Sequence, residues 1–202
     1  MSEEIIYPNT DNNAKYRIRS SHGAWAVART GAGLIALADL NVETRFSVTY
    51  WISRGFLSFN IPDYSPLVLT WARLRIRAWT IYVNSSVRPY LIMTKGFHSN
   101  PLVSTDWAAQ TEEITNYGQI SMVDFLPQTY YYIPFNASGL ALIQAAYGGT
   151  LKLCLRCQSD VENDPPVTGG HRIDYGTPSS AEAHKPLILL TFGEKRSQGY
   201  II

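Results

Sequence analysis

SRGFLSFNIPDYSPLVLTWARLRIRAW, residues 53–79, contains two stretches in which apolar and polar side chains alternate. In RGFLSFNIP (54–62) the apolar positions are Leu57, Phe59 and Ile61. In WARLRIRAW (71–79) they are Ala72, Leu74, Ile76 and Ala78. Because successive side chains of a strand point to opposite faces of its sheet, both stretches predict half-buried antiparallel strands.

Further strands are predicted where extended, apolar-rich segments lie between turn signals. They are TIYVNSS (80–86, continuing or bending the preceding strand), PYLIMTKGF (89–97), QISMVDFL (119–126), TYYYIPF (129–135), TLKLCLRCQ (150–158), GHRIDYG (170–176) and PLILLTF (186–192). One short helix is predicted in NASGLALIQAAYGG (136–149), where Asn136 caps the start and Gly148 ends it. The pattern predicts an all-β fold, a jelly-roll β-sandwich of two antiparallel sheets with one short helix.

Several segments of the chain also resemble one known family. They are SRGFLSFNIPDYSPLVLTWARLRIRAW, FNASGLALIQAA, LKLCLRCQSDVENDPPVTG and HKPLILLTF, in this order. They are similar to landmarks of the DNRLRE-type jelly-roll domains, which are related to alginate-binding carbohydrate-binding modules and occur in phage and environmental proteins. The resemblance extends from about Tyr16 to Phe192 and implies the jelly-roll fold.

Length and composition favour a single domain without a membrane or nucleic-acid partner. The 202 residues carry a net charge of +1, and charged residues make up 16% of the chain, which is not typical of a nucleic-acid-coating protein. No run approaches the roughly 18–20 apolar residues of a membrane helix. The start, MSEEIIYPNTDNN, does not resemble a signal peptide, so we expect folding in a cytoplasm.

The expected organisation is an N-terminal arm (1–13), a jelly-roll domain (14–192) and a C-terminal arm (193–202). The last three residues form an apolar tip, which is predicted to serve in assembly, for example of a homo-oligomer. They are Tyr200, Ile201 and Ile202. The alternative is a frayed chain end.

Cys154 and Cys157 have the spacing of some zinc and redox sites. However, LKLCLRC (151–157) alternates with a period of two, which predicts a strand. Residues three apart in a strand point to opposite faces, so the two thiols are expected to form neither a disulfide nor half of a chelate. Cys157 is expected to be buried with Leu153 and Leu155.

The acidic loop that follows supplies carboxylates at alternate positions, Asp160, Glu162 and Asp164. Hard oxygen ligands of this kind suit calcium, the one cofactor that the sequence suggests. The other interpretation is a solvated loop whose acids pair with Arg156 or Arg172, and the full spacing of a calcium-binding loop is missing.

A row of cationic side chains occupies the outward face of the strand at 71–79, namely Arg73, Arg75 and Arg77, with Trp79 continuing it. Guanidinium groups beside an aromatic ring can bind the hydroxyls or carboxylates of a sugar. The alternative is an ordinary charged face that meets a neighbouring subunit. TYYYIPF (129–135) is ambiguous as well, because either Tyr131 with Ile133 or Tyr130 with Tyr132 is buried.

The motifs give little support for an enzyme. The four histidines, His22, His98, His171 and His184, lie in loop-like segments without metal-ligand spacing, and we expect them to be surface or loop-packing residues. A nucleophile elbow and a phosphate-binding glycine loop are both missing from the sequence.

These features lead to one functional expectation and one alternative. The first is a non-enzymatic virion structural or decoration protein, associated with a phage capsid or tail, assembled in the host cytoplasm and partnered by other virion proteins. The alternative is a carbohydrate-binding module that recognises an acidic or neutral surface polysaccharide through the row at Arg73–Trp79.

Overall fold

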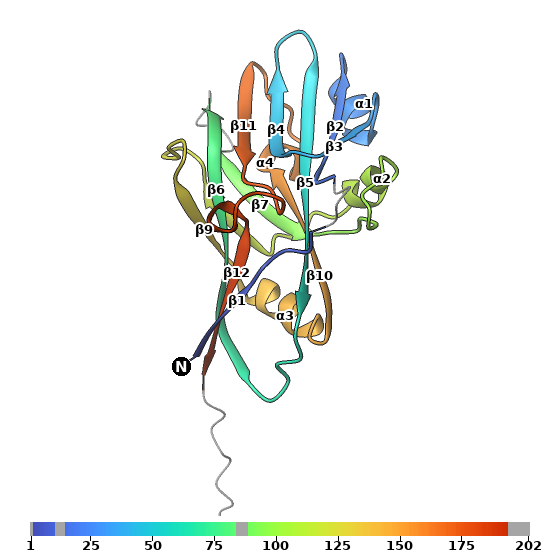
Figure 1. The fold of residues 1–202 in the computed structure, drawn as a ribbon. Coiled ribbons are helices and arrows are strands. Elements are labelled where there is room, and N and C mark those ends of the chain that lie inside the picture. The colour runs from blue at the N-terminus through green and yellow to red at the C-terminus, as the bar shows by residue number, and fades with distance from the viewer. Residues whose placement is uncertain (1, 11–14, 84–88, 194–202) are drawn as a thin grey trace, which may run out of the picture.

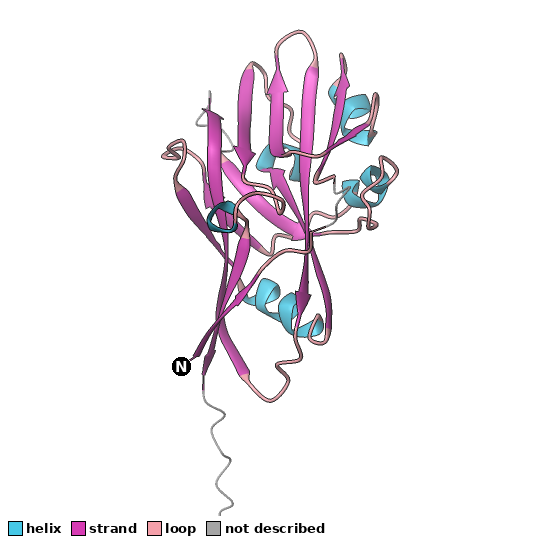
Figure 2. Cartoon of the chain, in the orientation of Figure 1, coloured by secondary structure: helices cyan, strands magenta, loops and turns pink. Residues whose placement is uncertain are grey.

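In the computed structural model, residues 2–10, 15–83 and 89–193 are described. Their strands are β1 (Ser2–Ile6), β2 (Arg17–His22), β3 (Ile35–Leu37), β4 (Leu40–Phe46), β5 (Tyr50–Ile61), β6 (Val68–Val83), β7 (Tyr90–Lys95), β8 (Gly118–Ser121), β9 (Tyr130–Pro134), β10 (Gly149–Cys157), β11 (Gly169–Tyr175) and β12 (Leu187–Gly193). The helices are α1 (Trp25–Thr30), α2 (Asp106–Thr111), α3 (Ala137–Ala145) and α4 (Gln158–Val161), with a 3-10 turn, η1 (Glu182–His184). Strands dominate the molecule (Figure 2), and the all-β prediction is confirmed.

The strands pair antiparallel in a curled sheet with the order β1-β12-β6-β11-β4-β5-β10-β7-β8. The two long strands β5 and β6 each pair with several other strands of this sheet (Figure 1). The first part of β6 pairs with β12 and β9, and its last part pairs with β11. β5 pairs with β2 and β4 near its start and with β10 along the rest of its length. The predicted continuation of the strand at 71–79 into 80–86 is therefore confirmed as far as Val83.

One apolar core fills the inner side of this sheet. It unites the inward rows predicted from alternation, Leu57 and Phe59 of β5, Leu74 and Ile76 of β6, and Leu153 and Leu155 of β10. All six are buried, so the predicted register of these three strands is confirmed. α3 packs into the same core through Leu140 and Ile143, and its N-terminus is capped by Asn136, whose Oδ1 accepts a hydrogen bond from the Gly139 N–H at 2.9 Å.

A second apolar cluster covers the opposite face of β5 and β10. Trp25 of α1 and Trp107 of α2 close over it. Cys154 lies here, whereas Cys157 lies in the main core. The two thiols therefore occupy opposite faces of β10 as predicted, and both are free.

The short helices α1, α2 and α4 were not expected, because four to six residues are too few to show a helical period. Strand 119–126 was expected to be longer, but β8 ends at Ser121. Ser2–Ile6, placed by the sequence within an N-terminal arm, pair with β12 as β1 at one edge of the sheet.

Candidate functional site

The outward face of β6 carries the cationic row. Arg73, Arg75 and Arg77 are half-buried and alternate with buried Leu74 and Ile76, so the row faces away from the core as predicted. Strand β9 lies beside it, with Tyr132 opposite Arg75 and Tyr130 opposite Arg77. Ile133 of β9 is fully buried, which resolves the earlier ambiguity and leaves Tyr130 and Tyr132 on the outward face.

Guanidinium groups and aromatic rings are interleaved across these two strands. The guanidinium carbon of Arg73 lies 4.5 Å from the ring of Trp71 and 4.4 Å from that of Tyr132. The guanidinium carbon of Arg77 lies 4.5 Å from the Trp79 ring. Arg75 and Arg77 lie 5.0 and 5.6 Å from the ring of Tyr130. We call this surface the Arg–aromatic face: Trp71, Arg73, Arg75, Arg77, Trp79, Tyr130 and Tyr132.

The segment that contains η1 fixes one side of the Arg–aromatic face. The carbonyl of Ala183 accepts hydrogen bonds from the Tyr130 hydroxyl at 2.8 Å and from Nη2 of Arg75 at 3.3 Å. The Trp79 ring packs edge-on against His184, with 5.1 Å between centroids. These contacts hold the aromatic and cationic groups in place before any partner arrives, which lowers the entropy lost on binding.

The face is positively charged and weakly neutralised. Glu3 of β1 approaches Arg73, with 3.8 Å between carboxylate and guanidinium, and both side chains are partly exposed. Arg75 and Arg77 form no ion pair with any of the described residues. An acidic partner would therefore meet two guanidinium groups that form no ion pair within the described part of the chain.

The structure gives Asp160 of the acidic loop a role that excludes calcium. Its Oδ2 accepts hydrogen bonds at 2.7 Å from Nε of Arg54 and from Nε of Arg156, and its Oδ1 accepts one at 2.8 Å from Nη2 of Arg54. All three side chains are buried. Three guanidinium groups lie at the carboxylate, those of Arg54, Arg156 and, at 3.9 Å, Arg29, and they repel a further cation, so the calcium hypothesis is wrong for this residue. The pairing with Arg156 is confirmed, whereas the solvated setting expected with it is wrong, because Asp160 is buried.

The other two acids of that loop do not complete a metal site. Glu162 is exposed and accepts a hydrogen bond from the Gln158 side chain at 2.7 Å. Asp164 is half-buried, and its backbone N–H donates to Ser159. Across residues 2–10, 15–83 and 89–193, no group of three acidic, histidine or cysteine side chains could hold a metal ion.

The buried ion cluster joins the helices to the sheet. Nη1 of Arg54 donates to the Trp107 carbonyl at 3.1 Å and to Thr111 Oγ1 at 2.9 Å, while its guanidinium stacks 3.8 Å from the Trp107 ring. Burial alone would raise the pKa of Asp160, but Arg156 and Arg54 together hold that pKa well below its usual range. The cluster is therefore ionised and structural at neutral pH.

The predicted assembly residues Tyr200, Ile201 and Ile202 lie outside the described residues. Trp71, Tyr130 and Tyr132 were not part of the predicted site. Trp71 could have been found, because it continues the Arg73–Trp79 row by one alternate position. The tyrosines could not, because their contribution depends on β9 pairing with β6.

Comparison of the chain with protein-family models and with curated proteins finds no match. The resemblance to DNRLRE-type domains stays a prediction from the quoted segments. In the described part of the chain, no helix has both the length and the apolar character needed to cross a membrane.

Proposed function

We propose that this protein is a non-enzymatic docking protein whose Arg–aromatic face attaches to an acidic surface of another macromolecule. The observation that carries the proposal is the interleaving of three guanidinium groups with four aromatic rings across β6 and β9. Arg, Trp and Tyr are the residues that most often dominate binding energy at protein interfaces.

The covered ring faces favour an acidic protein surface over a polysaccharide. A sugar that stacks on an aromatic side chain needs a free ring face, whereas guanidinium groups lie over the rings of Trp71, Trp79 and Tyr132. The N–H groups at the guanidinium edges are suited to carboxylates. Acidic polysaccharide is the second candidate, since uronate carboxylates offer the same oxygen pairs.

The same charges disfavour self-association through this face. A two-fold symmetric contact brings identical patches together and would set Arg75 and Arg77 against their own copies. The homo-oligomer expected from Tyr200, Ile201 and Ile202 would therefore use another surface.

We place this docking in a virion, as a capsid- or tail-associated structural or decoration protein assembled in the host cytoplasm. The resemblance to phage-associated jelly-roll domains supports this setting. We also propose that the curled sheet closes as a two-sheet jelly roll. In support, residues of β5 and β10 share one core with residues of β6 and β12. Capsid or tail genes beside the gene of this protein are the expected observation.

The class of partner can be tested with three immobilised polymers, poly-L-glutamate, polygalacturonate and neutral dextran. Binding is measured by surface plasmon resonance at matched ionic strength. We expect the strongest binding to poly-L-glutamate, a fall with added salt and none to dextran. Stronger binding to polygalacturonate would support the polysaccharide candidate, and equal binding to dextran would contradict both.

A further inference from the structure

A polar groove of about 540 Å³ lies on the outer face of β5 and β10, next to the second apolar cluster, since Ser58 and Lys152 each lie two residues along their strand from Phe56 and Cys154 of that cluster. Four side chains of β5 and β10 form the floor of the groove. In the register of these strands, Ser58 lies opposite Lys152 and Asn60 lies opposite Thr150. Directly opposed residues of antiparallel strands have Cβ atoms about 4.5–5.5 Å apart, so these four polar side chains form one cluster.

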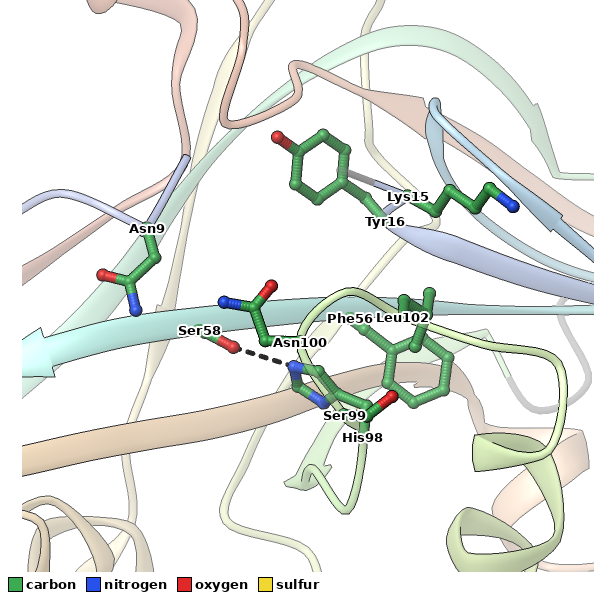
Figure 3. A pocket seen from close by; sticks show the side chains of 9 residues that line it. All are labelled: Asn9, Lys15, Tyr16, Phe56, Ser58, His98, Ser99, Asn100 and Leu102. Carbon is green, nitrogen blue, oxygen red and sulfur yellow. Dashed lines mark hydrogen bonds between the residues drawn. The ribbon is translucent and has the colours of Figure 1, made fainter. Parts of the chain in front are cut away.

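Two segments form the walls of the groove. Asn9 is held at one side, where its backbone N–H donates to the Ser58 carbonyl at 2.8 Å and its Nδ2 donates to Asn60 Oδ1 at 2.9 Å. Asn100, in the segment after β7, lines the other side. A recess of about 30 Å³ continues from the groove past Ser58 to His98, with Phe56 and Leu102 at its apolar end (Figure 3).

Several hydrogen-bond donors of this groove have no partner among the described residues. The Oδ1 of Asn60 accepts from Asn9 and from Thr150 Oγ1, the latter at 3.1 Å, so both of its lone pairs are used while its Nδ2 donors remain. The Lys152 ammonium donates one hydrogen to the His98 carbonyl at 2.6 Å, which anchors it and leaves two donors. The Asn100 amide has no hydrogen-bond partner within the described residues.

The Ser58–His98 pair adds a further donor rather than a nucleophile. Nε2 of His98 lies 2.8 Å from Ser58 Oγ, while its buried Nδ1 has no partner within the described chain. A buried N–H without an acceptor is rarer than an unpaired acceptor, which places the proton on Nε2, donating to Ser58 Oγ. The Ser58 hydroxyl proton can then point into the groove. Burial, followed by the Lys152 charge, lowers the pKa of His98 to about 4, too low for an effective general base at neutral pH.

We propose that this groove binds an oxyanion, a carboxylate, phosphate or sulfate group carried by a small ligand. Lys152 supplies the charge, and Asn60, Asn100 and Ser58 supply neutral donors. Among the described residues, no Asp or Glu lines the groove or its recess. A neutral sugar would need acceptors for its hydroxyl protons, and one of the amide oxygens of the groove, Asn60 Oδ1, is already occupied. This site is separate from the Arg–aromatic face and does not depend on it.

The test is isothermal titration of the full chain with sodium phosphate, sulfate and acetate, each balanced with sodium chloride to constant ionic strength, and with glucose as the neutral probe. We expect saturable binding of at least one oxyanion, and the strongest of the three identifies the class. Lys152→Gln should weaken it about tenfold or more, as for loss of a charged hydrogen bond. The control Lys185→Gln removes the same charge beside η1, outside the groove, and should leave the affinity unchanged.

Asn60→Asp provides a second variant if Lys152→Gln fails to fold. Asn60 is exposed, and an aspartate keeps the oxygen that accepts from Asn9 and Thr150 while replacing the amide donors with a carboxylate. We expect it to abolish oxyanion binding with its thermal unfolding nearly unchanged. The proposal is overturned if no oxyanion saturates, if glucose binds as well as the anions, or if Lys152→Gln and Lys185→Gln weaken binding equally.

Discussion

The guanidinium of Arg73 lies 4.4 Å from the ring of Tyr132, although the residue directly opposite Arg73 on β9 is Pro134. The contact is thus diagonal across the two strands, a distance that long side chains can reach. It gives Arg73 two rings, since Trp71 of its own strand lies 4.5 Å away. The Arg–aromatic face is therefore a coupled set of side chains rather than a row of independent charges.

Tyr132→Leu should lower the free energy of unfolding by about 0.5–1 kcal/mol, since one partly exposed cation–π contact is lost. Tyr132→Phe keeps the ring and is the matched control, with a smaller expected change. Urea denaturation of both variants measures the difference. Equal losses would mean that the hydroxyl, not the ring, stabilises this part of the face.

Asp160→Asn should destabilise the protein far more, by about 3–5 kcal/mol, because it leaves Arg54 and Arg156 buried without their counter-ion. The control is Glu162→Gln in the same loop, where an exposed side chain should change the stability by less than about 1 kcal/mol. Both are measured by chemical denaturation at neutral pH. Similar values for the two variants would show that the buried ion cluster does not hold the helices to the sheet.

The contribution of His98 to the stability of the protein should fall as the pH is lowered from about 6.5 to about 4, while Glu43, whose pKa is raised by burial, acts in the opposite direction. The folded-state pKa of His98 is about 4, below its usual value, so in this window the unfolded chain binds a proton that the folded protein does not. The slope from this group is at most about 1.4 kcal/mol per pH unit. Asp160 affects stability at lower pH, because its pKa is lower in the folded protein than in the unfolded chain. Its stabilising contribution is therefore lost only as the pH falls below the unfolded-state pKa of about 3.9.

His98→Gln separates these two effects. The variant removes the titrating group, so its stability should change less between pH 6.5 and 4 than that of the unaltered protein. Denaturant unfolding at several pH values within this window provides the comparison. An unchanged slope in the variant would show that His98 is not the responsible group.

Both cysteine thiols should resist modification in the folded protein. Burial raises the pKa of Cys154 and of Cys157 to about 12, and the thiolate is the reactive form. Ellman's reagent should therefore detect two thiols in denaturant and almost none without it. Loss of both thiols in a denatured, unreduced monomer would indicate a disulfide and contradict their placement on opposite faces of β10.

Alternation was enough to predict the inward and outward rows of β5, β6 and β10, because a period of two depends only on local geometry. Alternation alone does not explain Arg54, which lies on the face of RGFLSF opposite Leu57 and Phe59 and is nevertheless fully buried. Its burial depends on Asp160 and on α2, which are more than 50 residues away in sequence. The groove at Ser58 and Lys152 was missed for a related reason, since only the pairing of β5 with β10 brings these residues together.

The central claim is that the Arg–aromatic face binds an acidic partner, and the affinity for poly-L-glutamate of two arginine variants tests it most directly. Arg75→Gln removes a guanidinium from the face, whereas Arg19→Gln removes one that lies 4.9 Å from the ring of Trp51, outside it. Each variant loses one charge and one Arg–aromatic contact. The account predicts that Arg75→Gln weakens binding about tenfold or more, as for loss of a charged hydrogen bond, while Arg19→Gln changes it little. Equal weakening by both variants would show that binding follows the overall charge and would contradict the account.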